Sequence, residues 1–547
     1  MNFEQKVVYQ IYPKSFYDSD GDGLGDLQGV IEKLDYLQYL GVDLIWMTPF
    51  FPSPQKDNGY DVADYRSIDP RYGTMEILEN LIKEAKNRNI DIMLDMVFNH
   101  TSTKHIWFQK AMAGDPFYKD YYIFKKGKAD GSAPTNWESK FGGNAWEYVD
   151  RFDEYYLHLF DKTQADLNWE NPHVRDEIVD ILNFWIKKGV YGFRFDVVNL
   201  ISKPEVFEDD EKGDGRRFYT DGRHVHEFLK EINERTFGKD SRIITVGEMS
   251  STTLDNCVKY AGKDRHELNM VFNFHHLKVD YKNKQKWALQ PFDFKELKQL
   301  FHTWQMGMQT HDAWNALFWC NHDQPRALSR FGDDQNYPIE SAKMLATVIH
   351  MMRGTPYIYQ GEEIGMTNAY FTDIKQYRDV ESINYDQILK KQGKPEEEIY
   401  HILQERSRDN SRTPMQWNDQ RNAGFTSGTP WISVIDNYQD INVEKNMQDE
   451  DSVLAYYRTL IQLRKRYPVI SMGSYEPLLQ DHPSLFAYKR QYQKESMIVL
   501  NNFYGKETTI DIDVNGYQVL LSNYTQEENE DGVNLRPYET RVYYHAD

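Results

Sequence analysis

Eight short apolar runs recur along this 547-residue chain, and they constrain its fold more than any other feature. Each run is rich in β-branched and aromatic residues, and its apolar residues are continuous rather than alternating, which is typical of strands buried on both faces. Between several runs lie segments of helical period, at 27–41, 74–89, 171–189 and 341–354. Strand alternating with helix eight times predicts an α/β fold, a (β/α)8 TIM barrel. The runs are residues 7–13, 43–49, 91–99, 191–198, 243–249, 270–274, 316–321 and 355–361.

Two segments depart from this alternation. About 70 residues of aromatic, Gly-rich and Asn-rich sequence follow the third run, which is far longer than an ordinary loop. After residue 469 the sequence changes to short alternating runs separated by turn residues, which favours antiparallel strands. We therefore expect the barrel at residues 1–100 and 172–468, a small inserted domain after strand 3 at residues 101–171, and a C-terminal antiparallel β domain at residues 469–547.

Composition narrows the possible partners and compartments. The formal net charge of −21 argues against nucleic acid as a partner. No stretch approaches the roughly 18 consecutive apolar residues of a membrane helix, so we expect no membrane partner. The N-terminus lacks the pattern of a secretory signal, and a cytoplasmic location is expected. Cys257 and Cys320 are too few for a disulfide framework and are not spaced as a metal site.

Ionisable residues gather at the carboxyl ends of the predicted strands. In a barrel of this type those ends form one rim, where active sites are built. A single carboxylate at a strand end is usually a helix cap or a loop anchor, but the coincidence of seven such residues favours an active site. They are Asp61, His100, Arg194, Asp196, Glu248, His322 and Asp323.

Five segments around these residues carry a family resemblance. GYDVADY, DMVFNHTS, GFRFDVVN, VGEMSS and NHDQPR resemble, in order and spacing, the signature regions of the α-amylase superfamily of glycoside hydrolases. The resemblance covers essentially the whole chain. SRDNSRTPMQW (407–417) is similar to the intracellular α-glucosidase branch of that superfamily.

The resemblance implies a retaining mechanism with Asp196 as nucleophile, Glu248 as general acid/base and Asp323 as transition-state stabiliser. Retention needs two carboxylates about 5–5.5 Å apart, one to attack and one to protonate the leaving oxygen. Arg194 is expected to point with Asp196 into the site and keep it ionised near neutral pH, whereas Glu248 needs a less polar surrounding or a nearby carboxylate. No organic cofactor is implied. The residues implied to bind the hydroxyls of the transferred glucose are Asp61, His100, His322 and Arg412.

The stretch DSDGDGLGD (18–26) places carboxylates at alternating positions, like the first part of an EF-hand loop. The glutamate expected at the twelfth position is missing, because Gly29 stands there. The resemblance implies a structural Ca²⁺ at this loop, and the alternative is a solvated acidic turn. The expected ligands are Asp18, Asp20, Asp22, Asp26 and the carbonyl of Leu24.

A basic cluster follows the sixth run, where NFHHLKVDYKNKQKW (273–287) holds four lysines and two histidines in an acidic chain. A phosphate monoester carries about −1.5 to −2 charges near neutral pH, and such a cluster offsets its repulsion from the protein. The alternative is a solvated, exposed turn. The predicted phosphate ligands are His275, Lys278 and Lys286, with Lys284 as a weaker candidate.

Four segments resemble members of the α-glucosidase branch that act on phosphorylated trehalose: 213–229, 247–253, 274–281 and 286–294. The resemblance implies hydrolysis of the α,α-1,1 bond of trehalose 6-phosphate, a small-molecule partner, to glucose and glucose 6-phosphate. One departure is Arg223, where the resemblance leads us to expect proline. The alternatives are an oligo-1,6-glucosidase or dextran glucosidase, a transferase or isomerase, and a noncatalytic transporter-associated homologue.

Overall fold

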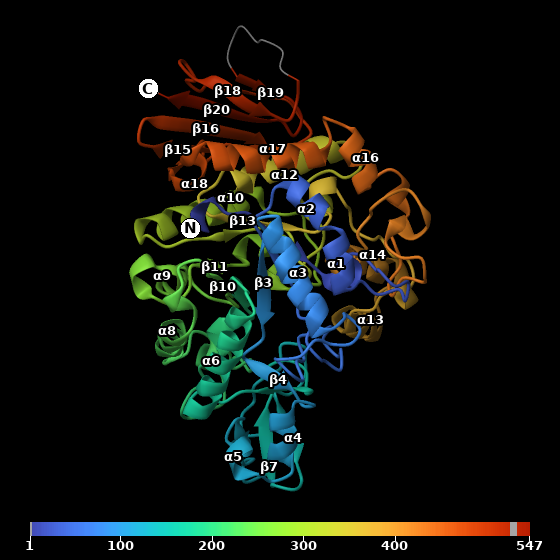
Figure 1. Ribbon diagram of the computed structural model, residues 1–547, viewed down its shortest axis with the longest axis vertical. Helices are drawn as coiled ribbons and strands as arrows, with labels where there is room; N and C mark the ends of the chain where they lie inside the picture. The colour runs from blue at the N-terminus through green and yellow to red at the C-terminus, as the bar shows by residue number, and fades with distance from the viewer. Residues whose placement is uncertain (1–2, 526–532, 547) are drawn as a thin grey trace. The chain divides into compact units, whose positions relative to one another are not determined.

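The computed structural model describes residues 3–525 and 533–546, and its central feature is an eight-stranded sheet (Figure 1). The strand order is β11-β10-β9-β3-β2-β1-β13-β12. Each of the eight apolar runs contains one of these strands, so the predicted (β/α)8 fold class is confirmed. The strands are β1 (Val8–Ile11), β2 (Leu44–Met47), β3 (Asp91–Met96), β9 (Gly192–Phe195), β10 (Ile244–Glu248), β11 (Met270–Phe272), β12 (Ala316–Leu317) and β13 (Thr355–Tyr359).

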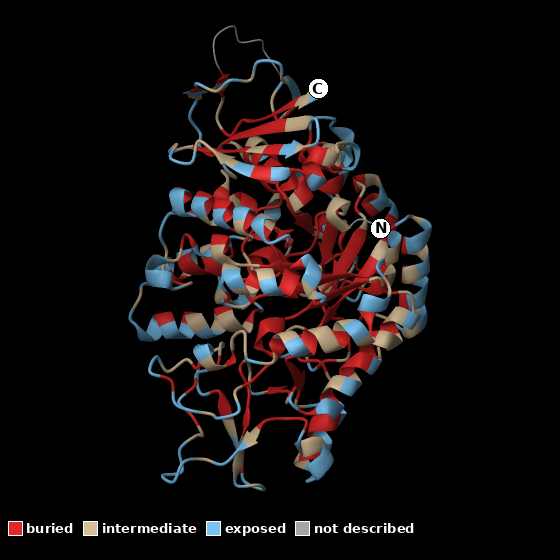
Figure 2. Cartoon of the chain, turned by 90° about the vertical axis from the view of Figure 1, so that its left-hand side faces the viewer, coloured by how far each residue is buried: buried red, intermediate tan, exposed pale blue. Residues whose placement is uncertain are grey.

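The helices follow the predicted periodic segments, with one break. Residues 27–41 form two helices instead of one, because Lys33 leaves the helical conformation with φ −105° and ψ 7°. Figure 2 shows buried strands and helices with exposed outer faces, which is the pattern expected of a two-layer α/β fold. The helices up to residue 261 are α1 (Leu27–Glu32), α2 (Leu34–Leu40), α3 (Met75–Asn87), α4 (Ile106–Met112), α5 (Pro116–Lys119), α6 (Pro172–Lys187), α7 (Arg216–Tyr219), α8 (Val225–Arg235) and α9 (Leu254–Ala261). Those that follow are α10 (Phe294–Thr310), α11 (Ala327–Phe331), α12 (Pro338–His350), α13 (Val380–Lys391), α14 (Glu396–Arg406), α15 (Asp409–Arg412), α16 (Val443–Gln448), α17 (Val453–Arg466) and α18 (Pro468–Met472).

The described chain divides into two compact units. The first comprises residues 46–83 and 91–273, and the second comprises the rest. In the first unit β3, β9, β10 and β11 pair in parallel, and the register sets Arg194 of β9 beside Asp95 of β3 and Val246 of β10. In the second unit β13 pairs in parallel with β1 and β12. The register of β3, β9 and β10 decides which side chains meet in the first unit's site.

The segment after β3 forms two small antiparallel sheets within the first unit. One joins β4 (His100–Ser102) to β8 (Gln164–Asp166), and the other has the order β5-β7-β6, with β5 at Phe124–Lys125, β6 at Trp146–Val149 and β7 at Glu154–Leu157. Its core packs Trp137 and Trp146 in one cluster with Val197, the residue after Asp196. The inserted segment is therefore packed against the strand-end loop of β9, while its boundaries at 101 and 171 stay a prediction.

The C-terminal residues form the predicted antiparallel sheet. Its strand order is β14-β15-β16-β20-β18, and β17 pairs with β19 beside it. Among the described residues, no helix is both long and apolar enough to cross a membrane. The strands are β14 (Ser474–Leu478), β15 (Leu485–Tyr492), β16 (Glu495–Asn502), β17 (Thr508–Ile510), β18 (Gln518–Ser522), β19 (Val533–Leu535) and β20 (Thr540–Ala546).

Candidate active site

Arg194 connects three carboxylates in the first unit. Its Nη1 donates to Asp95 Oδ1 and to Asp196 Oδ1, both at 2.7 Å, and its Nη2 donates to Glu248 Oε2. The Arg194 side chain is 1% exposed, whereas those of Asp196 and Glu248 are 11% and 12% exposed. Asp196 directly follows β9 and Glu248 is the last residue of β10, so parallel pairing brings the two carboxylates to one edge. The predicted grouping of Arg194 with Asp196 and Glu248 is present.

The pKa of Asp196 is consistent with the expected ionisation near neutral pH. Burial raises the pKa of Asp196 to about 6, Asp95 adds to the rise, and the attraction of Arg194 offsets it only in part. The arginine therefore keeps this carboxyl ionised above about pH 6, not throughout the acidic range. Glu248 is not in an apolar surrounding, because it contacts Arg194, but it does lie beside the Asp196 carboxyl, with which it forms a hydrogen bond.

Asp95 is a member of this site that the sequence reasoning missed. Its Oδ2 accepts from Trp46 Nε1 at 3.1 Å and from Tyr60 Oη at 2.9 Å, while its Oδ1 accepts from Arg194. Burial raises its pKa to about 6 as well, against the attraction of Arg194. The available signal was a carboxylate inside an otherwise apolar strand, DIMLDM. Such a residue is costly unless it is paired.

Asp61 and His100 are both buried in the first unit. Asp61 Oδ1 accepts from Ser53 Oγ at 2.7 Å and its Oδ2 from the Lys56 N–H at 2.9 Å. His100 Nε2 lies 3.0 Å from the carbonyl oxygen of Tyr60, and burial lowers its pKa. These polar atoms contact groups of the protein itself, and their roles in sugar binding stay predictions.

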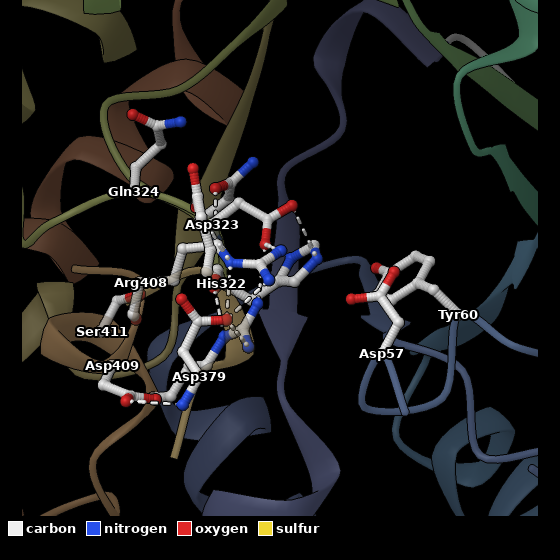
Figure 3. A network of polar contacts seen from close by, with 12 residues as sticks. Asp57, Tyr60, His322, Asp323, Gln324, Asp379, Arg408, Asp409 and Ser411 are labelled. Carbon is white, nitrogen blue, oxygen red and sulfur yellow. Dashed lines mark hydrogen bonds and ion pairs between the residues drawn. The ribbon is translucent and has the colours of Figure 1, made fainter. Parts of the chain in front are cut away.

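A second carboxylate site lies after β12 in the second unit. Asp323 Oδ1 accepts from Arg412 Nη2 at 2.7 Å. It also accepts from Arg408 Nη1 at 3.2 Å, and Asp323 Oδ2 lies 3.4 Å from His322 Nε2 (Figure 3). Burial alone would raise the pKa of Asp323. His322, Arg408 and Arg412 stabilise the carboxylate, however, and hold this pKa well below its usual range. Asp323 is therefore ionised throughout the range in which Asp196 titrates.

Asp379 and Arg408 complete this network, and the sequence reasoning named neither as a site residue. Arg408 Nη2 donates to Asp379 Oδ1 at 2.6 Å while its Nη1 donates to Asp323 (Figure 3). The Asp379 side chain has no exposed surface. Arg408 belongs to the SRDNSR segment, whose density of charged and polar residues was the available signal.

The basic cluster adopts two short 3₁₀ turns, His275–Lys278 and Lys282–Lys284. The His275 ring lies 4.4 Å from the Trp304 ring, and Lys278 and Lys284 are exposed. Lys286 Nζ donates to Glu381 Oε2 at 2.6 Å. The same Glu381 oxygen is 3.6 Å from Arg408 Nε, so Lys286 is linked through Glu381 to the network around Asp323.

The acidic loop before α1 brings three of its predicted ligands together. Asp18, Asp20 and Asp22 each offer an oxygen within 4.8 Å of the others. Asp26 is placed differently, since its carboxylate accepts from Ser19 and from the Gly29 N–H and caps α1. Carboxylate oxygens are the donors that Ca²⁺ prefers, so the first three residues fit a calcium ion.

Two protein-family models match the sequence of this chain. A model described as the catalytic domain of alpha amylase matches residues 10–473. The chain belongs to the α-amylase family. The C-terminal domain of alpha-amylase SusG matches residues 485–542, within the antiparallel sheet. The carboxylates of this α-amylase family member thus lie on the fold on which the family's glycosidases are built.

Individual relatives are similar along nearly the whole chain. The trehalose-6-phosphate hydrolases of Bacillus subtilis and Escherichia coli are 56% and 53% identical, covering 99% and 98% of this chain and 98% of each relative. The oligo-1,6-glucosidase of Parageobacillus thermoglucosidasius is 48% identical, and the match covers 99% of this chain and 98% of the relative. The crystal structure of Bacillus licheniformis trehalose-6-phosphate hydrolase superposes with a TM-score of 0.96 at 55% identity over 100% of both chains. The crystal structure of an isomaltulose synthase from Klebsiella superposes with a TM-score of 0.95 at 39% identity over 99% of both chains. The fold alone therefore does not determine the reaction.

The electrostatics of the first unit predict the acid limb of the pH profile. With Asp196 as the predicted nucleophile, we expect kcat/KM to rise with pH as its carboxyl loses its proton, because attack on a sugar carbon requires an ionised carboxylate. Because Asp95 raises the pKa of Asp196, Asp95→Asn should move the acid limb to lower pH by about half a unit or more. The measurement is kcat/KM from pH 4 to 8, with Asp166→Asn, a buried carboxylate bonded to other residues, as the control. An unmoved acid limb in Asp95→Asn would contradict the assigned coupling.

Proposed function

We propose that this chain hydrolyses trehalose 6-phosphate to glucose and glucose 6-phosphate. The observation that carries the proposal is the likeness, at 53–56% identity over nearly the whole length, to two trehalose-6-phosphate hydrolases. The compared oligo-1,6-glucosidase is 48% identical and remains the second candidate. The paired carboxylates around Arg194 favour an enzyme over a noncatalytic relative, because three acids on one buried cation serve no evident packing purpose.

In the proposed double displacement, Asp196 attacks the anomeric carbon while Glu248 gives its proton to the glycosidic oxygen. The bond to glucose 6-phosphate breaks, and the glucosyl ester forms on Asp196. Glu248 then takes a proton from water, which attacks the same carbon and releases glucose and Asp196. Asp323, as a permanent anion, is proposed to stabilise the positive charge of the transition state. The proposed ligands of the transferred glucose are Asp61, His100, His322 and Arg412.

The phosphate of the leaving sugar is proposed to meet the basic cluster, through His275, Lys278, Lys284 and Lys286. Lys286 carries the clearest consequence, since its ammonium donates to Glu381 Oε2 and has three N–H donors. Another of these donors suits a phosphate oxygen, so the ion pair does not exclude phosphate binding.

Substrate preference tests the proposed reaction. We expect kcat/KM for trehalose 6-phosphate to exceed that for isomaltose and for trehalose by about a hundredfold, or about 2.7 kcal/mol. Lys286→Ala and Lys278→Ala should reduce this preference by about tenfold or more, because each removes a charged hydrogen-bond donor. The measurement is steady-state kinetics on the three sugars with wild type and variants.

A surface lysine outside the cluster supplies the matched control. Lys394, which lies just before α14, is ion-paired to Glu398 in the first turn of that helix, and Lys394→Ala should leave the preference unchanged. Equal or better cleavage of isomaltose by the wild-type enzyme would instead identify an oligo-1,6-glucosidase. In that case the basic cluster is a solvated turn.

We also propose that Asp18, Asp20 and Asp22 bind a structural Ca²⁺, with the Leu24 carbonyl and Asp26 as further ligands. A calcium ion bound only to the folded protein stabilises it by mass action. We expect EDTA to lower Tm by about 2 °C or more relative to excess CaCl2, and Asp20→Asn/Asp22→Asn to abolish that difference. Equal Tm of the wild type in EDTA and in CaCl2 would refute the proposal.

A cytoplasmic location is part of the same proposal. A phosphorylated disaccharide does not cross membranes unaided, and uptake systems that phosphorylate during import release it inside the cell. The described helices include none that could cross a membrane. The proposed substrate and the proposed compartment therefore agree.

A further inference from the structure

Val197, the residue after Asp196, has an unusual backbone conformation. Its φ of 34° and ψ of 41° lie in the left-handed region, and no other valine, isoleucine or threonine among the described residues has a positive φ. A β-branched residue adopts this conformation only where the surrounding structure enforces it, often at a functional site. We propose that Asn199 is a positioning residue that holds this strained turn and thereby sets Asp196 relative to Glu248. The inference rests on the proposed hydrolysis, in which the two carboxylates act together.

The strained turn brings the main chain to the candidate general acid. The Val197 N–H donates to Glu248 Oε2 at 3.4 Å, and the Asp196 and Glu248 carboxyls also form a hydrogen bond. The Val197 carbonyl accepts from the Leu200 N–H at 2.9 Å, which closes the short 3₁₀ turn. Because Val197 is joined directly to Asp196, a shift of this turn moves the nucleophile and a main-chain donor of Glu248 together.

Asn199 ties this turn to the loop after Glu248. Its Oδ1 accepts from the Ser250 N–H at 2.8 Å, and its Nδ2 donates to the Ser250 carbonyl at 2.9 Å. Ser250 lies two residues beyond Glu248, and the Asn199 side chain is fully buried three residues beyond the nucleophile. One amide therefore fastens the loop that carries one carboxylate to the loop that follows the other.

Asp221 in turn fixes Asn199. Its Oδ1 accepts from Asn199 Nδ2 at 3.1 Å, and its N–H donates to the Asn199 carbonyl at 2.9 Å. The Asp221 carboxylate also accepts from three side chains of the segment after Ser250: Thr252 Oγ1 at 3.1 Å, Asn256 Nδ2 at 2.8 Å and Tyr260 Oη at 2.7 Å. Asp221 therefore joins the same two loops a second time.

Both carboxyls act on one bond in the proposed first step. Asp196 attacks the anomeric carbon while Glu248 protonates the oxygen that leaves it, so both must be in position at the same moment. A displacement of about 1 Å can cost about a hundredfold in rate. Loss of the proton donor matters most for a sugar, which is a poor leaving group without the proton, and least for fluoride, which leaves with little help. A residue that aligns the two carboxyls should therefore affect these leaving groups unequally.

The test compares Asn199→Ala with wild type on trehalose 6-phosphate and on α-glucosyl fluoride. We expect kcat/KM to fall about tenfold more for the sugar phosphate than for the fluoride, because only the former depends on the proton of Glu248. Azide attacks a glucosyl intermediate without a general base, so it should raise kcat of Asn199→Ala on the fluoride, with release of α-glucosyl azide, but not kcat of wild type. Asp221→Asn keeps the side-chain shape with one acceptor oxygen fewer and should change the same ratio by about threefold.

Asn269→Ala is the matched control. Asn269 Oδ1 accepts from the Thr245 N–H at 2.8 Å and from Thr245 Oγ1 at 3.1 Å, so this side chain also ties two segments of the first unit, but near the start of β10. It should lower Tm without changing the ratio. Equal falls on both substrates in Asn199→Ala, without activation by azide, would overturn the proposal and leave Asn199 a support of the fold alone. Should Asn199→Ala fail to fold, an unchanged ratio in Asp221→Asn overturns it.

The kinetics of wild type separate this inference from the proposed function. If wild type cleaves isomaltose better than trehalose 6-phosphate, the proposed function fails, and isomaltose serves as the sugar substrate in the same comparison. The ratio of sugar to fluoride then still decides the role of Asn199.

Discussion

The buried guanidinium of Arg194 is the interaction on which the first unit's site depends. It is 1% exposed and bonds to Asp95, Asp196 and Glu248, so one cation faces three acids where water screens little. Three ionised carboxylates would be incompatible with a single arginine in such a place, and burial raises the pKa of both Asp95 and Asp196 to about 6. The three carboxyls around Arg194 can therefore share a proton close to neutral pH. A pair of acids in which one is protonated and the other ionised requires such sharing.

Asp323 has the opposite electrostatics, and the contrast has a chemical use. Arg408 and Arg412 both donate to its Oδ1, and with His322 they hold its pKa well below the usual range despite burial. Asp95 and Asp196 therefore gain or lose protons near pH 6, whereas Asp323 remains an anion. A glycosidase needs both properties, since protons move at the nucleophile and acid while the positive charge of the transition state needs a partner that remains an anion.

The sequence predicted the eight strands because a strand buried on both faces leaves a continuous apolar run, and it placed Asp196 and Glu248 because both lie at strand ends. It could not identify Asp95, whose role depends on a strand about a hundred residues away: only the pairing of Asp95 with Arg194 shows that its carboxylate is needed. Asp379 was missed for a similar reason, since its partner Arg408 is 29 residues further along the chain, beyond α13 and α14. The division of residues 27–41 at Lys33 is a local backbone change that helical periodicity does not reveal.

The basic cluster shows why charge counted along a sequence is a weak guide to anion binding. Four lysines fall between 278 and 286, yet Lys286 is paired with Glu381, a residue on α13 that the count does not include. The carboxylate partly neutralises the charge of that lysine, so its attraction for phosphate is weaker than a count of lysines along the sequence implies.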